Sequence, residues 1–262
     1  MERKGFLRSA FLRSVERINL LRNPPRPYGL RRIIKHIREV EKRPAMIIEY
    51  KRCGPRGFLK HYTPWDYIRK TISIADAYSV LVEPYWFCGS LELIPWFAQY
   101  RPVLAKDFVV SFQQLLTYRQ KGASAALLIL DMLGWEMLDD LYADAMDIGI
   151  EVVIETSNAN DALEVMHSYP NAMIGLNARD LKTLNVNFTK LLTEISKVVS
   201  QKPSNALLIA ESGIDSLDKA LKLAELGVDG MLIGTWVMKD PSTASKKLVL
   251  LKNKERNHVE HG

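Results

Sequence analysis

The sequence predicts an α/β protein of the (β/α)8 type, a TIM barrel, with an additional basic helical segment before it. Eight short apolar runs follow residue 45, most of them spaced by roughly 22 to 25 residues. Stretches with helical periodicity separate the runs, which is typical of βαβ units and a parallel sheet. Eight such units in about 215 residues match the count and size of this barrel.

The eight predicted strands are apolar along their whole length, as expected where both faces of a sheet are buried. Their centres lie near Ile48, Val80, Val103, Leu128, Val153, Ile174, Leu208 and Leu232.

Four helices between the strands are predicted most clearly. One covers residues 215–226, with Asp215 as an acidic N-cap candidate and Gly227 as its stop. Apolar residues at helical spacing predict the other three, over residues 135–147, 159–168 and 186–200.

The segment before the first strand is basic and amphipathic. Apolar and basic positions alternate at helical spacing over the first 22 residues, which predicts a helix lying across the barrel. The proline-rich residues 23–27 end it, and a second basic helix over about 29–41 leads into the barrel. We therefore expect a helical extension packed on the barrel (1–44), the barrel (45–252) and a fraying polar tail (253–262).

Charge is concentrated at the N-terminus. Residues 1–44 carry a balance of +9 and the remainder −3, for a net charge of +6. A basic arm can bind nucleic acid. This one lacks the interleaved aromatic residues that stack on bases, so we favour a solvated cap that draws in an anionic substrate and expect no nucleic-acid partner.

Other function classes are disfavoured. No apolar run reaches the roughly 18 to 20 residues of a membrane span, and the N-terminus does not resemble a secretory signal. Two cysteines, Cys53 and Cys88, cannot build a disulfide framework or a structural zinc site. The expectation is a protein of the reducing cytoplasm, with no metal and no membrane contact.

Polar residues follow six of the apolar runs directly. If the runs are parallel strands, these residues meet at the carboxyl end of the barrel, which is its catalytic face. They are Glu49 and Lys51, Lys106, Glu155, Asn177 and Arg179, Glu211 to Gly213, and Gly234 with Thr235.

The charged members of this set are suited to acid–base chemistry. Glu49 and Lys51 are two residues apart and share a face. A buried Lys106 must either pair with a carboxylate or have a lowered pKa, and Glu155 is the expected partner across the barrel mouth. Asn177 and Arg179 also share a face, and the arginine offers a planar fork to oxygen atoms.

The seventh and eighth strands end in turns suited to phosphate. In many barrels the loops after these strands bind phosphate through backbone N–H groups and a helix N-terminus. Glu211 is followed by Ser212 and Gly213, and the last strand by Gly234 and Thr235, so phosphate binding is favoured there over simple turning of the chain.

At these residues the chain resembles the indole-3-glycerol-phosphate synthase family over roughly residues 45–240. The ordered set of motifs is specific. It comprises IIEYKR at 47–52, FCGS at 87–90, PVLAKDF at 102–108, Glu155, GLNARDL at 175–181, AESGI at 210–214 and IGT at 233–235.

The resemblance implies a reaction in tryptophan biosynthesis that needs no metal or organic cofactor. The substrate would be the anionic 1-(2-carboxyphenylamino)-1-deoxyribulose 5-phosphate, and the product indole-3-glycerol phosphate. Lys106 would polarise the ketone, Lys51 would hold the carboxylate, and Glu155 and Glu49 would be base candidates. The other implied contacts are Asn177, Arg179 and Glu211 for hydroxyls and the charge network; Phe87, Phe108, Leu127, Ile129 and Leu184 for the aromatic wall; and Ser212, Gly213, Gly234 and Thr235 for phosphate.

One loop departs from the family pattern. A Ser-Pro-Ser turn usually follows the first-strand lysine, whereas this chain has Gly54, Pro55 and Arg56. We hypothesise that Gly54 offers its backbone N–H and Arg56 its charge in place of the hydroxyls. Cys53, beside this loop, is interpreted as a small residue without chemistry.

Two other functions stay open at this point. A sugar-phosphate isomerase of the phosphoribosylanthranilate isomerase type would use a Cys and an Asp, leaving Lys106 and Glu155 without roles. An inactive barrel could bind RNA or a protein partner through residues 1–44. A monomer or weak homo-oligomer is expected.

Overall fold

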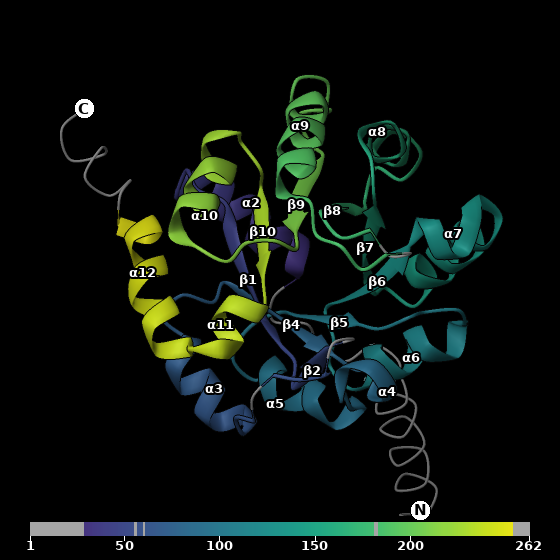
Figure 1. The fold of residues 1–262 in the computed structure, drawn as a ribbon. Helices are drawn as coiled ribbons and strands as arrows, with labels where there is room; N and C mark the ends of the chain where they lie inside the picture. The colour runs from purple at the N-terminus through teal and green to yellow at the C-terminus, as the bar shows by residue number, and fades with distance from the viewer. Residues whose placement is uncertain (1–28, 55–56, 60, 181–182, 254–262) are drawn as a thin grey trace, which may run out of the picture.

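A computed structural model describes residues 29–54, 57–59, 61–180 and 183–253, and a closed barrel of eight parallel strands is at its centre (Figure 1). The strands follow the order β1-β10-β9-β8-β7-β6-β5-β4, and β4 pairs with β1 to close the ring. This confirms the predicted fold class. The strands are β1 (Ala45–Tyr50), β4 (Ala77–Leu81), β5 (Val103–Lys106), β6 (Ala125–Ile129), β7 (Glu151–Thr156), β8 (Met173–Asn177), β9 (Leu207–Glu211) and β10 (Gly230–Ile233).

Helices surround the barrel (Figure 1). They are α2 (Leu30–Val40), α3 (Pro64–Thr71), α4 (Pro84–Phe87), the short 3-10 helix η1 (Leu91–Leu93), α5 (Ile94–Ala98), α6 (Phe112–Gln120), α7 (Leu130–Asp147), α8 (Ala159–Ser168), α9 (Phe188–Val199), α10 (Leu217–Glu225), α11 (Thr235–Lys239) and α12 (Pro241–Asn253).

The four predicted helices correspond to α7, α8, α9 and α10, and their bounds differ by at most two residues except at the start of α7. Ser216, not Asp215, caps α10, because its side chain accepts from the Lys219 N–H. α7 begins before the predicted residue 135, but Gly134 has a non-helical φ of 68° and separates the first turn from the rest. The predicted helix over the first 22 residues lies outside the described residues.

Two apolar clusters hold the barrel together. One lies between the sheet and the outer helices, and the other fills the barrel interior. α2 contributes Leu30, Ile34 and Ile37 to the interior cluster, against Ala45 at the start of β1. α2 therefore closes the amino end of the barrel, and in Figure 1 it lies behind the strands.

Buried ion pairs stabilise the same amino end. Arg43 donates to both carboxylate oxygens of Asp76 at 2.7 and 3.0 Å, and the Asp76 side chain also accepts from the Met46 N–H and from Lys252 of α12. Burial would raise the pKa of Asp76, but Arg43 lowers it below its usual value. This end of the molecule is built for stability, as is common in this fold.

A disulfide between Cys53 and Cys88 corrects the interpretation of the cysteines. Their Cα atoms are 5.4 Å apart. Cys53 belongs to a small antiparallel hairpin of β2 (Cys53–Gly54) and β3 (Gly57–Phe58), and Cys88 directly follows α4. Two cysteines suffice for one cross-link even though they cannot build a framework. Since disulfides are uncommon in reducing compartments, the cysteines give no support to a reducing one.

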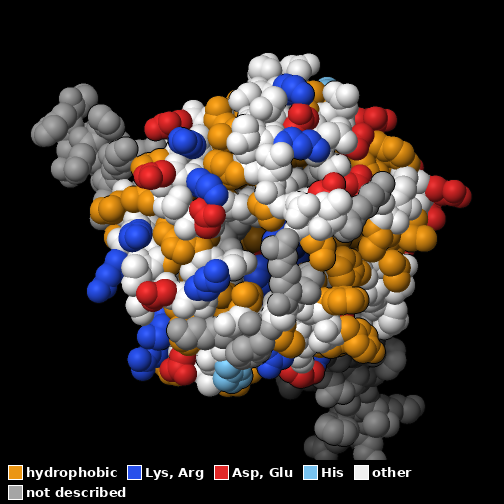
Figure 2. Space-filling model, in the orientation of Figure 1, with side chains coloured by type: hydrophobic (Ala, Val, Ile, Leu, Met, Phe, Trp, Pro, Cys, Tyr) orange, Lys and Arg blue, Asp and Glu red, His pale blue; other side chains and the backbone are white. Residues whose placement is uncertain are grey.

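The face opposite α2 is turned to the viewer in Figure 2. Basic side chains are visible in its central hollow, and hydrophobic side chains gather on the side of α6 and α7. None of the helices in the described part of the chain is long and apolar enough to cross a membrane.

Candidate active site

Four charged side chains at the carboxyl end of the barrel point into its interior. Glu49, Lys106, Glu155 and Glu211 each lie two residues beyond an apolar residue of the interior cluster, for example Glu211 beyond Ile209. Because successive side chains of a strand alternate between faces, the charged residue shares the inward face of the apolar one. The pattern of the strands therefore places these groups above the core, as the sequence predicts.

Lys106 is the centre of this group. Its Nζ lies 2.6 Å from Glu211 Oε2, 3.7 Å from Glu49 Oε2 and 4.0 Å from Glu155 Oε2. The expected pairing of Lys106 with Glu155 is thus only the longest of three, and Glu211 is the hydrogen-bonded partner. Glu211 is fully buried, so it serves the charge network more directly than a hydroxyl contact.

These carboxylates determine the charge of Lys106. Burial alone would lower the pKa of Lys106, but the attraction of Glu211, Glu49 and Glu155 raises it above the usual lysine value. Of the two alternatives in the sequence analysis, the paired lysine is therefore correct and the lowered pKa is wrong. Lys106 is therefore an ammonium near neutral pH.

Glu155, unlike Lys106, has a raised pKa that lies near neutral pH. Burial and the neighbouring charge of Glu211 raise the pKa of Glu155 to about 7, although Lys106 and Asn177 act against the shift. Asn177 donates from Nδ2 to Glu155 Oε1 at 2.7 Å, which fixes the carboxyl group. A carboxyl with such a pKa can both accept and release a proton near neutral pH.

Glu49 and Lys51 form a second pair. Lys51 donates to Glu49 Oε1 at 2.5 Å, so the two side chains share a face as predicted. Burial would raise the pKa of Glu49, but Lys51 and Lys106 lower it. Glu49 is accordingly a carboxylate, in contrast to Glu155 at the same level.

Two glycines make room for these carboxylates. A side chain at Gly175 would collide with Glu211 Oε1, and one at Gly234 would collide with the Glu49 carboxylate and approach Lys51. Gly234 was predicted only as a phosphate contact. The role of Gly175 was missed, although a glycine inside an apolar strand is a known signal of close approach.

Asn177 and Arg179 are held on the rim. The Arg179 N–H donates to Asn177 Oδ1 at 2.9 Å, and its guanidinium donates to the Leu184 carbonyl at 3.0 Å. Arg179 also contributes to the lowered pKa of Glu49, so its charge acts on the site. Leu184, predicted as an apolar wall, has a positive φ of 59° and anchors this arginine through its backbone.

The remaining predicted wall residues fall into two groups. Phe87 and Phe108 come from the loops after β4 and β5, and their ring centroids are 6.3 Å apart. Leu127 and Ile129 are buried in the interior cluster, with Ile129 paired in register with Glu155.

The predicted phosphate residues occupy two turns. Ser212 and Gly213 have consecutive positive φ values of 66° and 75°, which forms a sharp loop directly after β9. Gly234 is the N-cap position of α11, and Thr235 is its first residue. Gly54 lies in β2, whereas Arg56 is outside the described residues.

Ser79 is a site-facing residue that the sequence analysis missed. It is paired in register with Glu49 and Leu104, and its buried Oγ has no hydrogen-bond partner among the described residues. A serine within an apolar strand was the available signal, since buried hydroxyl groups normally have partners.

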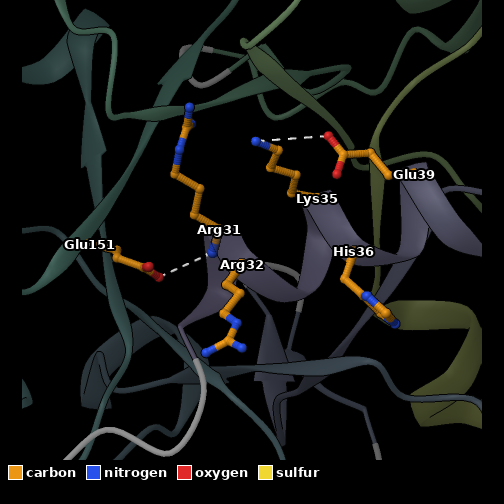
Figure 3. Close-up of a pocket in the computed structure, with 6 residues that line it drawn as sticks. All are labelled: Arg31, Arg32, Lys35, His36, Glu39 and Glu151. Carbon is orange, nitrogen blue, oxygen red and sulfur yellow. Dashed lines mark hydrogen bonds and ion pairs between the residues drawn. The ribbon is translucent and has the colours of Figure 1, made fainter.

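A hollow of about 390 Å³ lies at the other end of the barrel, beside α2 (Figure 3). Arg31 lines it, but its guanidinium donates to the carbonyls of Ala172, Pro170 and Asn205. Lys35 pairs with Glu39, and the labelled head groups point in different directions. This hollow is therefore not the catalytic site. Among the described residues, no group of three His, Cys, Asp or Glu side chains is placed to hold a metal ion.

Comparison with known proteins connects this geometry to one family. The family model for indole-3-glycerol phosphate synthase matches residues 14–248. The chain is 45% identical to the indole-3-glycerol phosphate synthase of Aeropyrum pernix, covering 95% of this chain and 98% of that protein. It is 38% identical to that of Pyrobaculum neutrophilum, covering 77% and 80%. Among solved structures, a mandelate oxidase mutant has a TM-score of 0.58 at 16% identity, covering 81% and 73%, and shows the fold alone.

Proposed function

The chain belongs to the indole-3-glycerol phosphate synthase family, and from this premise we propose how its barrel mouth carries out the reaction. The enzyme is a carboxy-lyase of tryptophan biosynthesis. It closes the ring of 1-(2-carboxyphenylamino)-1-deoxyribulose 5-phosphate with loss of carbon dioxide and water. The single observation that supports our assignment is the ammonium of Lys106 within 4.0 Å of three buried carboxylates.

Lys106 acts in ring closure. The aromatic carbon that bears the carboxylate attacks the ketone carbon, and negative charge develops on the ketone oxygen. Lys106 donates to that oxygen and then transfers a proton, giving a hydroxyl group. A preorganised ammonium in a buried site stabilises such charge strongly, because it needs no reorientation during the step.

Lys51 holds the carboxylate before it leaves. Its partner Glu49 limits where the ammonium can lie, since the pair is joined at 2.5 Å. Loss of carbon dioxide then returns the bonding electrons to the ring. Lys51 is also the candidate donor to the departing hydroxyl group, which leaves as water.

Glu155 accepts the proton that is lost from the substrate carbon during dehydration. Its pKa of about 7 suits a base that works near neutral pH. Glu49 is the second base candidate, but its lowered pKa makes it the weaker one. Glu211 keeps Lys106 charged and oriented, and Asn177 with Arg179 binds substrate hydroxyls at the rim.

An apolar wall receives the aromatic ring of the substrate. Phe87 and Phe108 lie side by side above the barrel, and Leu127, Ile129 and the Leu184 side chain complete the wall. Exclusion of water by this wall strengthens the electrostatic effect of both lysines.

The substrate phosphate binds at the turns after β9 and β10. The positive φ values at Ser212 and Gly213 support this, because consecutive backbone N–H groups in such turns form anion-binding concavities. Gly234 and Thr235 at the start of α11 add further N–H groups. Gly54 and Arg56 remain the proposed replacement for the missing serines.

The alternative functions have no support. A phosphoribosylanthranilate isomerase-like mechanism needs a free cysteine, whereas Cys53 is joined to Cys88. An inactive barrel does not account for the full set of charged groups. We keep the prediction of a monomer or weak homo-oligomer, since one chain supplies every group named above. A cytoplasmic location also stays a prediction, and the disulfide does not support it.

A product assay tests the function. The purified protein is incubated with the carboxyphenylamino substrate, and indole fluorescence and released carbon dioxide are recorded together. One indole-3-glycerol phosphate and one carbon dioxide should form per substrate consumed. Substrate consumption without an indole product would contradict the assignment.

A further inference from the structure

The Cys53–Cys88 disulfide joins two loops that carry proposed substrate contacts. Cys53 lies two residues after Lys51, in the loop that follows β1. Cys88 directly follows Phe87, in the loop after β4. The cross-link therefore connects the holder of the substrate carboxylate to the wall of its aromatic ring, across 35 residues of sequence.

Arg52 adds a second connection between the same loops. Its Nε donates to the Cys88 carbonyl at 2.9 Å, and its NH2 group donates to the same oxygen. The backbone carbonyl of Arg52 accepts from Leu59 N, which fixes the base of the β2–β3 hairpin. The chain from Lys51 to Cys53 is thus held on both sides of Arg52.

The loop after β4 is fixed in the same way. The Glu83 carboxylate accepts the backbone N–H groups of Tyr85, Trp86 and Phe87, which makes α4 a compact cap. Cys88 ends this helix with a positive φ of 52°. A non-glycine residue rarely adopts this conformation, so the surrounding bonds must hold it there.

We propose that Cys53, Cys88 and Arg52 are positioning residues that fix Lys51 relative to Phe87, so that substrate binding depends on the oxidation state of the disulfide. This rests on the proposed roles of Lys51 and Phe87. The catalytic Lys106 and Glu155 lie on β5 and β7, and neither of these strands carries a cysteine of the cross-link. The effect of the disulfide is therefore on binding more than on the chemical step.

Reduction consumes two electrons and two protons and converts the disulfide to two thiols. A dithiol reagent such as dithiothreitol supplies them and closes to its own cyclic disulfide. Cys53 is buried and Cys88 is partly exposed, so the reagent reaches the bond from the side of Cys88. Among the described residues, the bonds from Arg52 to the Cys88 carbonyl then still connect the two loops.

The test compares oxidised and reduced wild type, with thiol titration showing zero and two free thiols per chain. Steady-state kinetics are measured at a temperature at which circular dichroism shows both forms fully folded. Reduction should raise KM for the carboxyphenylamino substrate about tenfold and lower kcat by a smaller factor, because Lys51 is also a candidate donor in dehydration. Reoxidation should reverse both changes. An unchanged KM, or a loss confined to kcat, would overturn the proposal.

A double variant, Cys53→Ser with Cys88→Ser, is the matched control. It should have the high KM of the reduced wild type and show no further change with dithiothreitol. A double variant with the KM of the oxidised wild type would also overturn the proposal. If the oxidised wild type makes no indole-3-glycerol phosphate, the proposed function fails instead, which separates the two outcomes.

Discussion

At the scale of single residues, the surroundings of two glutamates in the site shift their pKa values in opposite directions. Glu49 faces two lysines and has a lowered pKa, whereas Glu155 faces Glu211 and has a pKa of about 7. One carboxylate is thereby committed to holding charge and the other to moving protons. Groups whose environments push their pKa values apart are typical of acid–base sites.

The acid limb of the pH profile of kcat/KM tests the role of Glu155. A base must be deprotonated, so kcat/KM should fall as the pH drops below about 7. The alkaline limb should lie above the usual range of lysine, because the pKa of Lys106 is raised. A pH series of kcat/KM measures both limbs. An acid limb near the ordinary glutamate value of 4.5 would contradict the assignment of Glu155.

Glu155→Gln is the control for this profile. It should lower kcat by about 100- to 10,000-fold and remove the limb near pH 7. The wild-type native state binds more protons than the unfolded state between pH 4.5 and 7, so its free energy of unfolding decreases as the pH rises through this window. The variant should lack this decrease, which is on the order of 2 kcal/mol, in denaturant titrations at both ends of the window.

At the scale of elements, the strands determine which residues meet. Runs that end in charged residues could be identified from the sequence, and so could the inward face, because alternation along a strand is strict. The preferred partner of Lys106 could not be identified from the sequence. It depends on how far the neighbouring strands are staggered, and this placed Glu211 closer than Glu155. The disulfide was missed because its two cysteines meet only once two separate loops are folded.

Replacing Gly175 in β8 tests whether the close approach of this strand to Glu211 keeps the site in order. Gly175→Ala would place a methyl group where the Glu211 carboxylate lies. Glu211 must then move away from Lys106, so kcat/KM should fall by about 10- to 100-fold and stability by roughly 1–3 kcal/mol. Steady-state kinetics and denaturant unfolding measure the two effects.

Gly230→Ala is the matched variant, since Gly230 also lies in a strand. Its added methyl group would meet Ile209 Cγ1 at 3.3 Å, with no site residue nearby. It should keep wild-type kcat/KM. Equal activity losses in both variants would show that Gly175 has no special relation to Glu211.

At the scale of the whole molecule, stability and chemistry occupy opposite ends of the barrel. The amino end is closed by α2 and by the Arg43–Asp76 pair, whereas the charges at the carboxyl end surround an open mouth. The fold could be predicted from the spacing of the apolar runs, and the catalytic end from the polar residues that follow them. The Arg43–Asp76 pair at the amino end could not, because its two residues come from separate segments of the chain. Residues 1–28 and Arg56 lie outside the described part, so the predicted first helix and the arginine phosphate contact remain predictions.

The central claim is that the ammonium of Lys106 drives ring closure. The most direct measurement is kcat for indole-3-glycerol phosphate formation by Lys106→Ala, with circular dichroism to verify folding. Lys121→Ala is the matched control, because Lys121 pairs with Glu92 on the surface. We predict a loss of at least about 100-fold for Lys106→Ala and wild-type activity for the control. Full activity in a folded Lys106→Ala variant would contradict the account.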